Sequence, residues 1–189
     1  MTLLILLFIG LILCCAFYAT YVSLIKKKNK TLEAFSSIDV QLKKRYDLIP
    51  NILTIAQKFM EHEKGLLEEV TKLRTKAISL PNDINSISEK IELDSQIKSL
   101  MGQIMVSVEN YPQLKSDQTM VMAMQTYNEV EEHIAAARRF YNSAVLELNN
   151  AVEIFPSSLI ASMIGINKQE FFQADEAERK SINAADYLK

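Results

Sequence analysis

The chain has 189 residues, of which 23% are charged, and a formal net charge of −2. This balance offers no basic face for nucleic acid, so no nucleic-acid partner is predicted. The chain has two cysteines, Cys14 and Cys15, and both precede the charged part of the sequence. Beyond residue 15, therefore, neither a disulfide nor a thiolate metal site is expected.

The first 25 residues contain no charged side chain, and four lysines follow at once: Lys26, Lys27, Lys28 and Lys30. A helix of about 20 apolar residues crosses the roughly 30 Å hydrocarbon layer of a bilayer. Residues 1–25 are therefore predicted to be a transmembrane anchor and residues 26–30 a basic juxtamembrane segment. The lysine-rich flank tends to stay in the cytoplasm. This predicts a single-pass protein of the cell membrane, with its N-terminus outside and its C-terminal domain in the cytoplasm.

Two alternatives exist for this apolar segment. A cleaved signal peptide has a positive region before its apolar core, whereas here the charges come after it. A lipidated cysteine is usually preceded by small side chains, whereas Cys14 follows Leu11, Ile12 and Leu13. We therefore interpret the two cysteines as apolar thiols that face lipid or a neighbouring helix. The lysines are interpreted as a solvated flank, or as a site for anionic lipid worth roughly 1 kcal/mol for each lysine.

Residues 31–180 are predicted to form one helical bundle, and residues 181–189 a flexible tail. Apolar residues recur at alternating steps of four and three along two long stretches, as in helices packed side by side. The expected fold class is all-α: an up-and-down antiparallel bundle of three long helices plus short C-terminal helices, preceded by the N-terminal transmembrane helix. The expected helices cover residues 31–77, 86–110 and 118–155, followed by short ones at 157–164 and 167–180.

Local signals refine these bounds. Pro50 falls inside the first helix and predicts a kink near Asp47, not an end. No turn signal separates the anchor from that helix, so the two are expected to form one rod. Residues 79–83 form the first clear break, and Ser86 with Glu89 matches a capping box. Ser116 or Asp117 is expected to cap the third long helix.

Four charged residues lie on the apolar seams, where an apolar side chain would cost less to bury: Arg45, Glu63, Glu131 and Arg138. In a bundle of three long helices the first and third are parallel, and aligning their lengths sets Glu63 level with Arg138. These two residues are predicted to be partners. Such a pair either fixes the alignment of the helices or forms a polar site for an ion or a small ligand.

No catalytic, metal or cofactor site is predicted. A di-iron bundle needs Glu-x-x-His, and neither His62 nor His133 has Glu three residues before it. His62-Glu63 begins a zinc-protease pattern, but the second histidine is missing. The chain also lacks a phosphate-binding glycine-rich loop and a Gly-x-Ser-x-Gly nucleophile elbow. It is therefore not expected to be an enzyme.

The sequence resembles the LemA family of bacterial membrane proteins. The resemblance is carried by residues 37–52, which read SIDVQLKKRYDLIPNI, and by Tyr111-Pro112, Ala137-Arg138-Arg139 and Phe155-Pro156-Ser157. It implies an anchor with the N-terminus outside and a cytoplasmic bundle of antiparallel helices, with no established catalytic activity. A relative that takes part in building magnetosome membranes implies a role in organising membranes. The chain departs from the family pattern at Glu132-His133 and at residues 79–88.

The leading hypothesis is a non-enzymatic, membrane-anchored scaffold or assembly protein that binds protein partners or copies of itself. Met60, Tyr46 and the methionine-rich residues 120–124 are candidate contact surfaces. The alternative is a membrane-remodelling or membrane-organising protein that acts on lipid through self-assembly. In that case residues 159–172 are expected to lie on the bilayer through Phe171 and Phe172. In both cases the lipid bilayer is a partner.

Overall fold

A computed structural model describes residues 1–81 and 83–172. These residues form helices and short 3-10 turns and contain no strand, which confirms the all-α fold. The chain divides into two compact units. Of the described residues, unit 1 contains Met1–Asp47 and Gln125–Phe171, and unit 2 contains Leu48–Met124 and Phe172. The predicted tail and residues 173–180 lie outside the described residues.

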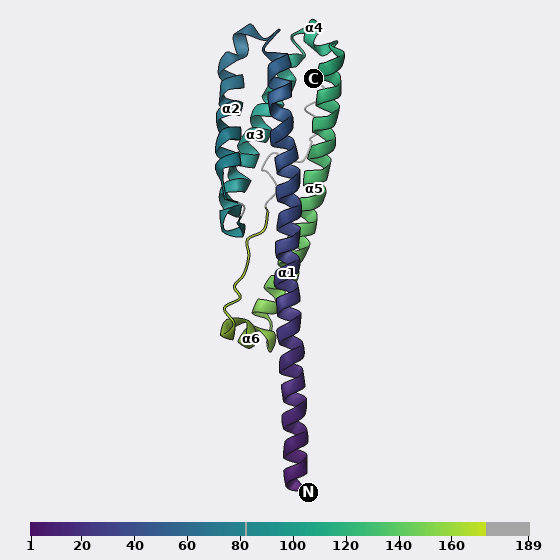
Figure 1. The fold of residues 1–189 in the computed structure, drawn as a ribbon, viewed down its shortest axis with the longest axis vertical. Helices are drawn as coiled ribbons and strands as arrows, with labels where there is room; N and C mark the ends of the chain where they lie inside the picture. The colour runs from purple at the N-terminus through teal and green to yellow at the C-terminus, as the bar shows by residue number, and fades with distance from the viewer. Residues whose placement is uncertain (82, 173–189) are drawn as a thin grey trace, which may run out of the picture. The chain divides into compact units, whose positions relative to one another are not determined.

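The long helix α1 spans Thr2–Ala56 without interruption, so the apolar segment and the helix that follows form one rod (Figure 1). Among the described helices, α1 alone is long and apolar enough to cross a bilayer. Pro50 lies inside it, and the helix continues to Ala56. The division between the two units falls beside this proline, at Asp47. The kink itself stays a prediction.

In unit 1, α1 packs against α5, which spans Gln118–Glu153, and against α6, which spans Ser157–Met163. Thr31 bonds to Ala144, and Arg45 bonds to Glu131. Rising residue numbers on α1 therefore meet falling numbers on α5, and the two helices are antiparallel. The buried side chains between them include Ile38, Leu42, Ile134, Tyr141 and Val145.

Unit 2 contains the end of α1, the start of α5 and the helices between them. These are η1 (Glu61–Glu63), α2 (Lys64–Ser79), η2 (Ile84–Ser86), α3 (Ile87–Val108) and α4 (Pro112–Lys115). Helix α2 packs on α3, which also contacts η2 and α4. Ile97, Met101 and Ile104 of α3 are fully buried in its core.

One predicted helix was wrong in its extent. The first long helix does not run to Ala77, because α1 ends at Ala56 and the chain turns before α2. The amides of Lys58 and Phe59 bond to carbonyls only three residues back, which tightens the chain out of the helix. Met60, which follows, is 1% exposed and is held in the core of unit 2. Neither Gly nor Pro marks this turn, so the four-three spacing of the seam concealed it.

The short signals gave mixed results. The Asp117 cap is confirmed, since its carboxylate accepts the amide of Met120 at 2.9 Å. Ser86 does precede α3, but its hydroxyl donates to the carbonyls of Pro81 and Asp83, so the capping box does not form. The short helix α6 ends within one residue of where the sequence predicted, and Gly165 follows it with a left-handed φ of 68°.

The helix expected to open at Asn167 is absent from residues 167–172, which have no regular structure. Instead, this segment is tied to α5 by side chains. The Asn149 amide donates to the carbonyl of Gln169 and accepts its N–H, each at 2.9 Å. The Tyr141 hydroxyl donates to the carbonyl of Glu170 at 3.0 Å. Burial, and then the nearby Glu170 carboxylate, raise the pKa of Tyr141 to about 12.

Replacing Asn149 with alanine should release this segment. Two hydrogen bonds are lost, each worth about 1 kcal/mol net. Hydrogen exchange followed by mass spectrometry should then show faster exchange at Gln169 by roughly one order of magnitude or more. Asn150→Ala is the matched control, because Asn150 is the exposed neighbour of Asn149 on α5. Equal exchange at Gln169 in both variants would contradict the tie.

Candidate functional site

The first candidate site lies where the apolar part of α1 meets the helical body of unit 1. We call it the collar, and it consists of Leu24, Lys27, Lys30 and Thr31 of α1 with Glu147 of α5. Leu24 is 1% exposed and packs in one cluster with Leu148 of α5 and with Ile160 and Ala161 of α6. Most side chains of α1 before Leu24 are exposed. The apolar run of the sequence therefore contains two environments: an exposed stretch of membrane-spanning length, and a last turn that is part of the protein core.

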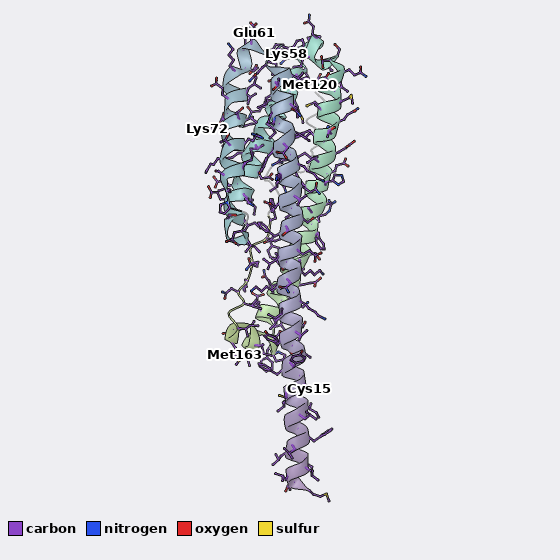
Figure 2. All side chains as sticks on the ribbon, in the orientation of Figure 1. Cys15, Lys58, Glu61, Lys72, Met120 and Met163 are labelled. Atoms are coloured by element: carbon purple, nitrogen blue, oxygen red, sulfur yellow. The ribbon has the colours of Figure 1, made fainter. Side chains whose placement is uncertain are left out.

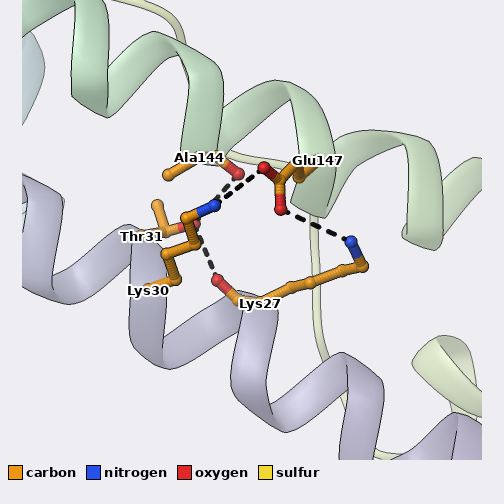
Figure 3. A network of polar contacts seen from close by, with 5 residues as sticks. All are labelled: Lys27, Lys30, Thr31, Ala144 and Glu147. Carbon is orange, nitrogen blue, oxygen red and sulfur yellow. Dashed lines mark hydrogen bonds and ion pairs between the residues drawn. The ribbon is translucent and has the colours of Figure 1, made fainter.

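The four lysines of the predicted membrane flank divide into two pairs. The Lys30 ammonium donates to the Glu147 carboxylate at 2.8 Å, and Lys27 lies 3.6 Å from the other oxygen of that carboxylate (Figure 3). Lys26 and Lys28 are exposed. The helical repeat explains this division, because residues three apart share a face. Two lysines thus bind α5, and the other two are exposed.

A buried hydroxyl completes the collar. Thr31 is 1% exposed, and its Oγ1 is 3.0 Å from the carbonyl of Lys27 on its own helix and 3.4 Å from that of Ala144 on α5 (Figure 3). The hydrogen bond from Lys30 and the charges of Lys30 and Lys27 hold the pKa of Glu147 below its ordinary value, against a smaller opposing effect of burial. Glu147 is therefore ionised at neutral pH and joins the helices just beyond the apolar stretch.

The second candidate site is a charged pair inside unit 1. Arg45 is fully buried, and its Nη1 lies 2.7 Å from Oε1 of Glu131, whose side chain is 22% exposed. The guanidinium also lies 5.7 Å from the ring centre of Tyr46. Tyr127, one turn before Glu131, is 2% exposed. Burial above all raises the pKa of Tyr127, which keeps it a neutral phenol beside the pair.

The pairing predicted from the sequence rested on a wrong alignment. Helix α5 is antiparallel to α1, so a parallel register cannot set Glu63 beside Arg138, and the partner of Glu131 is Arg45. Arg138 is half-buried on α5 in unit 1, and Glu63 is half-buried in η1 of unit 2. The extra turn after Ala56 is the reason, because it adds one reversal of the chain before α5.

The buried charges of α3 were missed from the sequence. Asp94 is 0% exposed and Lys90 is 7% exposed, four residues apart on this helix. A lysine and an aspartate at that spacing share one helix face, and this was the signal available. Ile87, Ile91 and Ile97 give the same helix an apolar pattern that conceals this signal.

The chemistry available at both sites is that of ion pairs between helices. Within residues 1–81 and 83–172, no group of three or more His, Cys, Asp or Glu side chains is placed to hold a metal ion. His62 and His133 are exposed. The contacts at the collar and at Arg45 therefore hold helices together. The exposed side chains next to the collar are those of the apolar stretch of α1 and of Lys26 and Lys28.

Comparison with known proteins adds the family. The sequence model of the LemA family matches residues 34–185. Protein LemA of Metamycoplasma hominis is 26% identical over 174 residues, which cover 90% of this chain and 78% of the relative. The magnetosome proteins MamQ 1 and MamQ 2 of Paramagnetospirillum magneticum are each 23% identical over 188 residues, covering 86% of this chain and 69% of the relative.

Replacing Arg45 with alanine should destabilise the protein by about 3–5 kcal/mol, because the Glu131 charge loses its partner beside a dry core. Lys44→Ala, at the exposed neighbouring position, should change the free energy of unfolding by less than about 0.5 kcal/mol. Denaturant unfolding in detergent micelles measures both. The double variant Arg45→Met/Glu131→Leu should recover much of the stability that Arg45→Ala loses. Equal stability of the Arg45→Ala and Lys44→Ala variants would contradict the buried pair.

Lowering the pH should remove the stability that the ion pairs of Glu147 contribute. Because the pKa of Glu147 is lowered by folding, its contribution is fully present above the unfolded pKa and is lost as the pH falls through the folded one. The side chain is 41% exposed, so this contribution is at most about 1 kcal/mol.

Glu147→Gln should remove that part of the acid dependence of the melting temperature, measured from pH 7 downward. The exposed Glu132→Gln serves as the control. An acid profile that Glu147→Gln leaves unchanged would contradict the role of the collar.

Proposed function

Because this chain belongs to the LemA family, we propose that it is a non-enzymatic, membrane-anchored scaffold that presents a helical body to protein partners or to further copies of itself. The proposed location is the cell membrane, crossed once by α1, with the N-terminus outside. The exposed lysines on the body side of the span support this orientation.

The observation that carries the proposal is the absence of a linker within α1. The apolar stretch continues as helix into unit 1, and Leu24 is already part of the core of that unit. The ion pairs of Glu147 hold α1 to α5 within the next two turns. A flexible linker lets a domain reach in many directions. A continuous helix instead holds unit 1 at a set height and angle, as the positioning of partners requires.

Exposed apolar side chains supply contact points for such partners. Val40 of α1 is 52% exposed and Phe140 of α5 is 42% exposed, and both lie between the Thr31 and Arg45 contacts of unit 1. Met122, in the methionine-rich start of α5, is 61% exposed. Two other expected contact residues were wrong, because Met60 and Tyr46 are 1% and 6% exposed and belong to the core.

The names of the relatives support a second candidate function. Two of them are named magnetosome proteins, and a magnetosome is a membrane compartment. The same anchored body would then organise membrane by assembling with copies of itself. Neither family name denotes an enzyme, in agreement with the non-enzymatic role proposed here.

Site-specific photo-crosslinking in native membranes tests the scaffold. A photoreactive residue at Val40 or Phe140 should give defined adducts of higher mass, which mass spectrometry identifies. The matched control is Ile134, whose side chain is 1% exposed on α5 and cannot reach a partner. The exposed positions yielding no more adduct than Ile134 would contradict a scaffold role for unit 1.

A pair of insertions tests whether the continuous helix matters. A flexible Gly-Ser segment of about two helical turns, placed between Tyr21 and Val22, should reduce the yield of those adducts. An Ala-rich helical insertion of the same length preserves the phase of the helix and should keep more of the yield. Equal yields from the two insertions would show that the rigid connection has no part in partner contact.

A further inference from the structure

Four large apolar side chains are exposed around α6: Ile154 and Phe155 just before it, and Leu159 and Met163 within it. Their exposed fractions are 60%, 73%, 60% and 74%. Leu159 and Met163 are four residues apart within α6, the spacing of one helix face, and Ile154 and Phe155 lie in the turn that precedes it. We call these four residues the α6 apolar patch. Soluble proteins rarely expose so many large apolar side chains together, and such a patch marks a contact surface.

The rest of α6 is fixed to the body. Ile160 and Ala161 are buried against Leu24 of α1 and Leu148 of α5. After the turn at Gly165, the chain returns along α5 and is held there by Asn149 through Gln169, and by an ion pair between Lys168 and Glu153. The patch is therefore attached at both ends and on its inner side, and it cannot fold away without breaking these contacts.

The position of the patch along the axis of α1 indicates which part of a bilayer it would meet. Residues 2–21 of α1 would span about 30 Å, which is the hydrocarbon thickness of a bilayer. Leu24 lies three residues further, about 4.5 Å along the axis, within a headgroup layer about 5–7 Å deep. Since α6 packs on Leu24, it lies at the same height. In unit 1 it is the element nearest the stretch of α1 that runs alone (Figure 1), and Met163 points out from it (Figure 2).

We propose that the α6 apolar patch inserts into the headgroup region of the cytoplasmic leaflet and is a second membrane contact of this protein. The occupant is an anionic bilayer surface, because Lys26 and Lys28 are exposed at the same level of α1. Exposed apolar side chains combined with exposed lysines are the composition of protein surfaces that lie in the membrane interface. The inference rests on the proposed anchoring by α1, but not on the scaffold role.

The two residues expected from the sequence to contact lipid differ, because Phe171 is 43% exposed whereas Phe172 is buried. Phe172 is 3% exposed and is a core residue, so it cannot lie on lipid. The exposed apolar side chains of this part of the chain are concentrated before it, around α6. Their apolar character was visible in the sequence, but their position beside Leu24 required the fold.

The absence of Trp from the sequence gives a direct test in the full-length protein. Three single-tryptophan variants are reconstituted in vesicles of phosphatidylcholine and phosphatidylglycerol: Leu159→Trp in the patch, Phe140→Trp on α5, and Phe8→Trp in the apolar part of α1. Each is quenched in turn by lipids with brominated acyl chains and by acrylamide in the water. All three replaced side chains are exposed and large, so each variant is expected to fold.

The fluorescence of Leu159→Trp should be shifted to shorter wavelength and lose at least half its intensity with brominated lipid. Phe140→Trp should instead be quenched by acrylamide and keep its intensity with brominated lipid. The proposal is overturned if Phe8→Trp is quenched by brominated lipid while Leu159→Trp behaves like Phe140→Trp. It is also overturned if Leu159→Trp is shielded from both quenchers, which would show protein, such as a second copy, on the patch. Failure of brominated lipid to quench Phe8→Trp would overturn the anchoring and the patch together.

Discussion

One uninterrupted ladder of backbone hydrogen bonds joins the apolar segment to the helical body, and the rest of unit 1 depends on it. Because α1 has no break before Ala56, any side chain that fixes the helix in the body also fixes the apolar stretch. Leu24 does so through its apolar contacts, and Lys27 and Lys30 do so through Glu147. Each of these contacts involves few residues, but a continuous helix carries the axial position and the rotation that they fix along its whole length. In the proposed role, the same helix would therefore both anchor and position the body.

Ion pairs at two sites hold the same two helices in different surroundings: Lys27 and Lys30 with Glu147, and Arg45 with Glu131. The collar pair at Glu147 is about two-fifths exposed and adds little stability. In the second pair the Arg45 side chain is fully buried, and burying such a pair adds little net stability to the fold. Its value lies in specificity, since sliding α5 by one turn would leave a buried guanidinium without its carboxylate. Apolar seams alone tolerate such a slip far better. The Arg45 pair is therefore proposed to select the antiparallel register, and the Glu147 pairs agree with that register up to the end of the apolar stretch.

The four lysines of one short segment lie in two environments. Lys27 and Lys30 pair with Glu147 of α5, whereas Lys26 and Lys28 are exposed, and the proposed membrane contact assigns these two to lipid headgroups. Helix α6 lies at the same level and buries Ile160 and Ala161 while it exposes Leu159 and Met163. The body thus ends in a surface that is apolar and positively charged where the exposed apolar stretch of α1 begins.

The sequence by itself determined the apolar stretch with its lysines, the all-α class, the break after Ser79, the Asp117 cap and the stop at Gly165. Each of these depends on residues close together in the chain, where periodicity and turn chemistry act directly. It also marked Arg45 and Glu131 as charges on apolar seams. Only the tertiary structure decided that they are partners, that the chain turns at residues 57–60, and that residues 167–172 are held by Asn149 and Tyr141. Those outcomes depend on contacts between distant residues. One long helix and two helices in a hairpin show the same spacing of four and three. Only the burial of Met60 in the core of unit 2 distinguishes the hairpin from the single helix.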